Sequence, residues 1–110
     1  MPVLERLKQG KTPVWLGVVG EEVPEAVQEE GDVPAGLYVT GIQDGSPAFA
    51  AGLQYGDIIT MFDETTVRGM YSLQSALTRT EAGQNITLTV MRWSREGYSE
   101  LRIPVELGSR

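Results

Sequence analysis

The side chains that most often carry out chemistry in proteins are scarce in this chain. It has 110 residues, with no histidine and no cysteine. This composition excludes a Ser-His-Asp triad, thiol catalysis and disulfide bonds, and it removes the commonest zinc ligands. Asp57, which directly follows Gly56, is an isolated acid with no second group spaced to form an acid–base pair with it. We therefore expect no catalytic apparatus in the chain.

Paired carboxylates are the remaining side chains that could bind a metal. They occur as Glu21-Glu22 and Glu29-Glu30. Their spacing fits no calcium-binding loop, and a solvated helix face accounts for them. Neither a metal ion nor a cofactor is expected.

The backbone offers a different kind of chemistry in residues 12–20 (TPVWLGVVG), a short apolar run interrupted by glycine. Glycine inside a strand-like run usually marks a bulge or the close approach of another segment. We interpret the run as a loop that turns into an open strand edge. Such a loop can offer N–H groups to an anion, and such an edge can pair with an extended peptide. A plain core strand is the alternative, and for this segment considered alone it is the more frequent outcome.

Charge is unevenly distributed along the chain, whose net charge is -6. No Lys or Arg occurs between Lys11 and Arg68, an interval that contains ten Asp and Glu. A solvated acidic face explains this pattern, and a preference for ligands with basic residues is the second interpretation. Nucleic acid is not an expected partner, because phosphate binding needs a basic surface. Direct membrane insertion is not expected either, because no apolar run approaches the length of a membrane span.

Residues 37–62 contain the clearest local signals. We expect a central strand at 37–42, apolar on both faces, and a second buried strand at 57–62. Between them, Ser46 is predicted to cap a short helix, with Pro47 at its first position and Gly52 at its end.

The remaining elements are predicted from periodicity. An acidic helix is expected at 21–30 with Val23, Ala26 and Val27 on its buried side, and a helix at 70–80 with an apolar stripe. A short strand at 65–67 and two alternating strands at 85–93 and 98–107, joined by a hairpin loop, complete the pattern. Pro104 suggests an edge or a bulge. The predicted fold class is a small α+β domain, a partly open β-barrel or sandwich of five to six strands capped by two to three helices.

Two segments carry a family resemblance: residues 36–39 (GLYV) and residues 45–59 (GSPAFAAGLQYGDII). Their order of strand, capped short helix, Gly-x-x-x-Gly-Asp and strand resembles the central signature of a bacterial PDZ domain. The predicted helix with Leu73-x-x-Ala76-Leu77, then Gly83 and the strand at 87–92, continue the match over roughly residues 14–107. The chain looks most like the PDZ domain of HtrA-type (Deg) trypsin-like serine proteases, and PDZ domains of other membrane-linked or tail-processing proteases share much of the signature.

The resemblance also implies a domain organisation. Residues 13–108 would form the PDZ domain, and residues 1–12 would be a linker with a short helix from an upstream protease domain. The chain would then be an excised module of an extracytoplasmic, membrane-anchored protease. Its expected partners are the C-terminal peptides of unfolded or partner proteins, together with that protease domain.

The resemblance assigns a peptide-binding role to the run at 12–20. The N–H groups of Leu16, Gly17 and Val18 would bind the terminal carboxylate of a peptide, and the edge through Val19 and Gly20 would pair with it as an added strand. On the predicted helix, the spacing i, i+4 and i+7 selects three residues that would line the side-chain pockets: Met70, Gln74 and Leu77.

These assignments predict the ligand. Leu77, with Leu16 and Val18, would enclose the last ligand side chain, and Met70 would lie over the third-last. Many animal PDZ domains have histidine at the position of Met70 and select a hydroxyl; with methionine, we expect apolar C-terminal residues and broad tolerance. Two alternatives stay open: Met70 and Leu77 could be core residues, and the fold could serve assembly with its groove occluded by the acidic helix or a neighbouring subunit.

Overall fold

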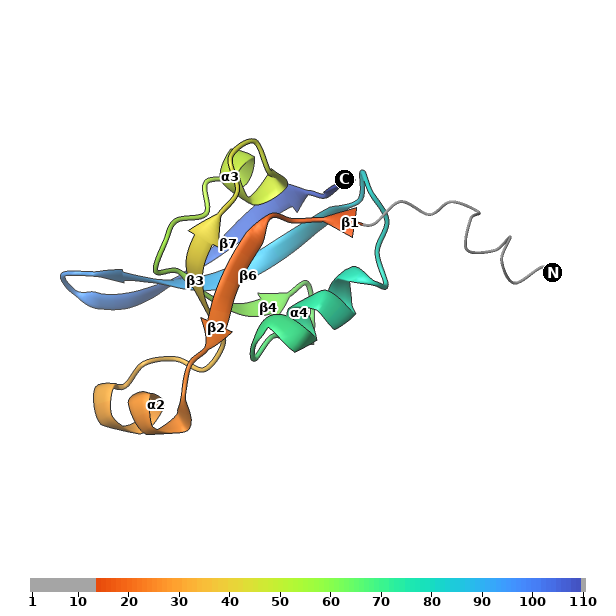
Figure 1. The fold of residues 1–110 in the computed structure, drawn as a ribbon. Helices are drawn as coiled ribbons and strands as arrows, with labels where there is room; N and C mark the ends of the chain where they lie inside the picture. Colours follow the sequence, from red (N-terminus) through yellow and green to blue (C-terminus); the bar gives the residue numbers. More distant parts are fainter. Residues whose placement is uncertain (1–13, 110) are drawn as a thin grey trace.

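The computed structural model describes residues 14–109, and the predicted linker and short helix at 1–12 lie outside them. The main sheet is antiparallel, in the order β2-β3-β4-β6-β7, with β5 beside β4 (Figure 1). Its strands are β2 (Val18–Glu22), β3 (Leu37–Ile42), β4 (Ile58–Phe62), β5 (Thr65–Thr66), β6 (Asn85–Ser94) and β7 (Gly97–Glu106). A separate two-stranded pair joins β1 (Val14–Trp15) to β8 (Gly108–Ser109).

Three helices lie in the described part of the chain: α2 (Glu25–Gly31), α3 (Pro47–Ala51) and α4 (Met70–Leu77). The open α+β architecture confirms the predicted fold class. The strand total exceeds the prediction because the two-residue strands β1 and β8 are too short to give a periodic signal. The short strand predicted at 65–67 is present as β5.

The core lies between the inner face of the sheet and α4. On β6, the alternating residues Ile86, Leu88 and Val90 are all buried, as predicted from the period of two. Leu73 and Ala76 are the buried residues of α4, and they belong to the same apolar cluster. Burial of one face of the sheet and one stripe of the helix is what holds α4 in place.

Helix α3 begins and ends as its sequence predicts. The Ser46 side chain accepts a hydrogen bond from the Phe49 N–H at 3.1 Å, which satisfies one of the free donors of the first turn. Pro47 occupies the first turn, and Gly52 ends the helix in the left-handed region with φ of +92°. Local capping therefore sets both ends of this five-residue helix.

Three predicted boundaries or faces were wrong. Residues 21–22 continue β2, and the acidic helix begins only at Glu25. Val23 is buried ahead of the helix, whereas Ala26 and Val27 are exposed. Strand β3 is central, but only one of its faces is buried, because Tyr38 and Thr40 point to solvent.

The C-terminal end of one other helix also differs from the prediction. Helix α4 ends at Leu77 rather than Thr80. The next residues form hydrogen bonds across three residues instead of four, such as the one from the Thr80 N–H to the Leu77 carbonyl at 3.0 Å. Pro104 lies on β7, which ends the sheet order, so the predicted edge position is confirmed.

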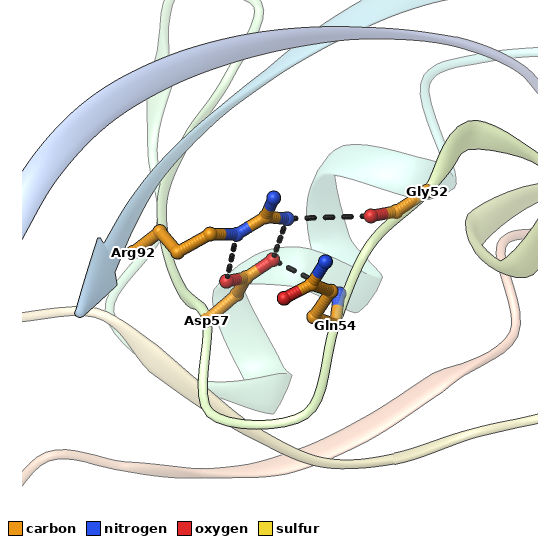
Figure 2. Close-up of polar contacts among 4 residues, drawn as sticks. All are labelled: Gly52, Gln54, Asp57 and Arg92. Atoms are coloured by element: carbon orange, nitrogen blue, oxygen red, sulfur yellow. Dashed lines mark hydrogen bonds and ion pairs between the residues drawn. The ribbon is translucent and has the colours of Figure 1, made fainter. Parts of the chain in front are cut away.

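A buried ion pair ties the turn after α3 to strand β6 (Figure 2). The guanidinium of Arg92 donates to both carboxylate oxygens of Asp57, at 2.8 and 2.7 Å, and to the Gly52 carbonyl at 3.3 Å. The same carboxylate accepts from the Gln54 N–H at 3.0 Å. The hydrogen bond to Asp57 raises the pKa of Arg92 above its already high ordinary value, so the guanidinium stays charged at physiological pH.

Replacing Arg92 by methionine should destabilise the domain. The Asp57 side chain is only 2% exposed, so the substitution leaves a carboxylate without its bidentate partner. We expect a loss of about 2–4 kcal/mol in the free energy of unfolding, measured with urea. The matched control is Arg102→Met, whose partner Glu100 is 53% exposed; it should change stability by less than about 1 kcal/mol. Equal effects of the two substitutions would contradict a structural role for the Asp57–Arg92 pair.

Candidate functional site

A groove of about 370 Å³ lies between β2 and α4, which run beside each other in Figure 1. It brings together all but one of the residues predicted for peptide binding. Seven of its lining residues are Leu16, Gly17, Val18, Val19, Met70, Gln74 and Leu77. Gly20 does not line it.

The loop at one end of the groove is fixed by its carbonyl groups. The Leu16 carbonyl accepts a hydrogen bond from the Ala48 N–H, and the Gly17 carbonyl accepts one from the Gln43 N–H, both at 2.9 Å. Within residues 14–109, no hydrogen bond is made by the N–H groups of Leu16 and Gly17. The loop thus directs its acceptors into the protein and leaves donors for an anion.

Gly17 is required at this position for two separate reasons. Its φ of +92° lies in the region that side chains disfavour. A Cβ atom placed on it would lie 2.2 Å from the Ser46 Cβ. The expectation that this glycine marks a close approach is therefore confirmed, and the approaching segment is the N-terminus of α3.

Strand β2 provides an open edge. It stands at the end of the sheet order and pairs only with β3, so its outer edge has no strand partner among the described residues. Its register shifts between Val19 and Gly20, and a Cβ on Gly20 would lie 2.3 Å from the Tyr38 carbonyl oxygen. Gly20 therefore allows the two strands to approach closely at this shift, where β3 has one residue more than β2.

Helix α4 forms the opposite wall. Met70 and Leu77 are half-buried and pack against the core while lining the groove, and Gln74 is exposed between them. Met70 and Leu77 thus both pack against the core and line the groove, so the two alternatives do not exclude each other. Leu73, from the motif on the predicted helix, is 1% exposed and also lines the groove.

Sequence reasoning missed a side-chain hydrogen bond in the lining of the groove, near the loop. The indole Nε1 of Trp15 donates to the Gln43 side-chain oxygen at 2.7 Å, and both residues line the groove together with Val14. These two residues are 28 positions apart, and no periodic pattern links them.

The acidic helix α2 contributes no residue to the lining of this groove. Pro24 and Val27 line a different depression, which opens elsewhere on the molecule. Among residues 14–109, no helix has the length and apolar character needed to cross a membrane.

An open antiparallel sheet with a glycine loop, a free edge and a flanking helix defines a domain suited to strand addition. A family model described as PDZ domain matches residues 14–105. The chain belongs to the PDZ domain family.

Within that family, the relatives are HtrA-type proteases. The chain is 33% identical over 96 residues to a probable periplasmic serine endoprotease DegP-like of Hahella chejuensis, covering 86% of this chain and 20% of the relative. It is 34% identical over 107 residues to the DegP-like protein of Pseudomonas fluorescens, covering 94% and 22%. The chain thus spans about a fifth of the length of the curated relatives it matches.

Solved structures agree with this assignment. The HtrA-type protease AlgW with a tripeptide matches with a TM-score of 0.74 and 28% identity, over 98% of this chain and 36% of that one. The HtrA3 PDZ domain bound to a phage-derived ligand, FGRWV, matches with a TM-score of 0.69 and 22% identity, over 86% and 84%, which supports the fold alone. The chain is thus a PDZ domain like that of HtrA-type proteases, and a PDZ domain is not itself catalytic.

Substituting Gly17 by alanine should destabilise the domain more than its positive φ alone would, because the new Cβ would also meet Ser46. Gly52 has the same φ of +92°, but nothing lies within 4 Å of its notional Cβ. Gly52→Ala should therefore lower stability by about 1–2 kcal/mol, and Gly17→Ala by roughly 1–3 kcal/mol more. Thermal and urea unfolding of both variants measure the difference. If the two variants unfold alike, contact between Gly17 and Ser46 does not constrain the loop.

Proposed function

We propose that the groove between β2 and α4 binds the C-terminal end of an extended peptide. The peptide adds to the free edge of β2 as a further antiparallel strand, and its terminal carboxylate accepts hydrogen bonds from the N–H groups of Leu16, Gly17 and Val18. The observation that carries this proposal is the loop itself, whose carbonyls are bonded inward at the end of an open strand edge. Peptide ligands in the related AlgW structures support it.

The chemistry of the walls determines which side chains the groove accepts. Leu16 and Val18 belong to the apolar core cluster, and Leu77 packs against that cluster from α4, so a ligand side chain beside them meets only apolar surface. Met70 adds a flexible apolar wall. The groove therefore accepts apolar C-terminal residues with broad tolerance. It offers no histidine for selecting a ligand hydroxyl.

In its physiological setting, the domain would serve an HtrA-type serine protease outside the cytoplasm. The names of the DegP-like relatives as periplasmic endoproteases support this setting. Peptide binding would either tether the C-termini of unfolded proteins for cleavage or shift the attached protease between states. The second role requires that the peptide-bound domain contact the protease differently from the free domain. Membrane anchoring of the full-length protein remains a prediction.

The test is a titration of the domain with peptides selected from a library with random C-terminal residues. Each selected peptide is then measured with a free and with an amidated C-terminus. Amidation removes the charge that the loop is proposed to bind, so affinity should fall at least about tenfold, near 1.4 kcal/mol. Hits that bind equally well after amidation would refute carboxylate recognition, and no hits at all would favour an assembly role.

A pair of variants on α4 tests the pocket. Leu77→Asn places an amide against the last ligand side chain and should weaken peptides with apolar ends by about tenfold. Tyr71 is on the same helix but is 85% exposed and does not line the groove, so Tyr71→Ala should leave affinity within about twofold. A similar loss in both variants would indicate damage to α4 rather than loss of a pocket.

A further inference from the structure

A second surface, away from the groove, gathers half of the aromatic residues of the chain. The chain has two Phe, two Trp and four Tyr. Three of the tyrosines and one tryptophan line a single open pocket of about 450 Å³: Tyr38, Tyr55, Tyr98 and Trp93. The rings of Trp93 and Tyr98 meet edge to face, with their centroids 5.0 Å apart. This pocket shares no lining residue with the groove.

The aromatic pocket continues into the depression beside α2. Val33, Tyr38 and Tyr98 line both, and Val27 adds apolar surface from α2. Together these six residues form what we call the aromatic face: Val27, Val33, Tyr38, Tyr55, Trp93 and Tyr98. Several are strongly exposed for apolar side chains, with Tyr55 at 68% and Trp93 at 63%. Exposed clusters of Tyr and Trp are typical of binding surfaces, because they bury large areas with little loss of conformational entropy.

Charge around the aromatic face is predominantly negative. The segment from the end of β2 through α2 carries six exposed carboxylates: Glu21, Glu22, Glu25, Glu29, Glu30 and Asp32. Of these, Glu21 and Glu22 line the depression itself. The one cation in the pocket lining, Arg92, is already bonded to Asp57. Arg95, in the hairpin turn between β6 and β7, is followed directly by Glu96.

We propose that the aromatic face binds a second polypeptide segment, one in which Lys or Arg alternates with apolar residues. The exposed rings accept guanidinium or ammonium groups by cation–π contact, and the carboxylates of α2 supply complementary charge. Val27 and Val33 take the intervening apolar side chains. A second copy of this chain is a poorer occupant, because two acidic rims would face each other.

The probe is an acetylated and amidated decapeptide of alternating Leu and Arg, which has no free carboxylate for the groove. A matched decapeptide replaces each Arg by citrulline, which keeps the shape and removes the charge. Binding is measured by fluorescence anisotropy at 150 mM salt and mapped by amide and indole NMR shifts, in which Trp93 and Trp15 give separate signals. We expect saturable binding of the Arg peptide, shifts at Trp93 and Tyr55, and at least about tenfold weaker binding of the citrulline peptide.

Matched variants separate this site from general attraction to an acidic protein. Trp93→Ser and the double variant Glu25→Lys, Glu29→Lys should each weaken binding about tenfold. Tyr71→Ser and Glu64→Lys, which alter an exposed tyrosine and an exposed glutamate outside the aromatic face, should stay within about twofold. Because all five positions are exposed, the variants should fold, and their NMR dispersion verifies this.

Several results would overturn the proposal. These are no saturable binding, equal losses in the control variants, equal affinity for the citrulline peptide, or shifts confined to Leu16, Gly17 and α4. Self-association that rises with concentration and disappears in Trp93→Ser would identify a second copy as the occupant instead. None of these results depends on whether the groove binds C-terminal peptides, because the probes are amidated and Trp93 does not line the groove.

Discussion

The contact between the Leu16–Val18 loop and the start of α3 is the interaction on which the groove depends. Helix α3 has free N–H groups in its first turn, as every helix does. The Ala48 N–H is satisfied by the Leu16 carbonyl, and the Phe49 N–H by the Ser46 side chain. The loop is therefore part of the cap of the helix. The Leu16 carbonyl is committed to this role and the Gly17 carbonyl to the Gln43 N–H, so the loop presents N–H groups outward. Only a glycine at position 17 lets the loop come so close to Ser46.

An unpaired strand edge is a risk to a soluble domain, and the features around β2 limit it. The strand is five residues long, shifts its register against β3 between Val19 and Gly20, and ends in two glutamates. Bulges, charges and short length are the usual protections against pairing with the wrong chain. Helix α4 stands along the same edge, held by the buried Leu73 and Ala76, so access is restricted to one slender extended segment. The features that protect the edge thus also select the form of its ligand.

Sequence reasoning succeeded where interactions between sequence neighbours determine the structure, and it failed where pairing between distant strands determines it. Helix α3 was predicted in detail because its capping residues are neighbours in sequence. Residues 21–22 were assigned to a helix, but pairing of Glu21 with Tyr38 extends β2 through them, since ladder bonds override helix propensity. Strand β3 was expected to be apolar on both faces because Tyr38 was counted as an apolar residue. In the structure, the Tyr38 side chain is exposed and belongs to the aromatic face. Met70, Gln74 and Leu77 followed from helical spacing plus family resemblance, whereas the Trp15–Gln43 hydrogen bond required the tertiary structure.

The Asp57–Arg92 pair connects the stability of the fold to the character of its second surface. Asp57 is the isolated acid that sequence alone offers as a candidate catalytic group, but its two oxygens are occupied by Arg92 and by the Gln54 N–H. The pair fixes the turn that carries Tyr55 against the strand that carries Trp93, so these rings stand on a rigid base. It also neutralises the one cation in the lining of the aromatic pocket. Because an unpaired Arg92 would repel a basic segment, its pairing with Asp57 leaves the α2 carboxylates to dominate the local potential. One buried contact can therefore both hold the domain together and set the sign of charge that its aromatic face attracts.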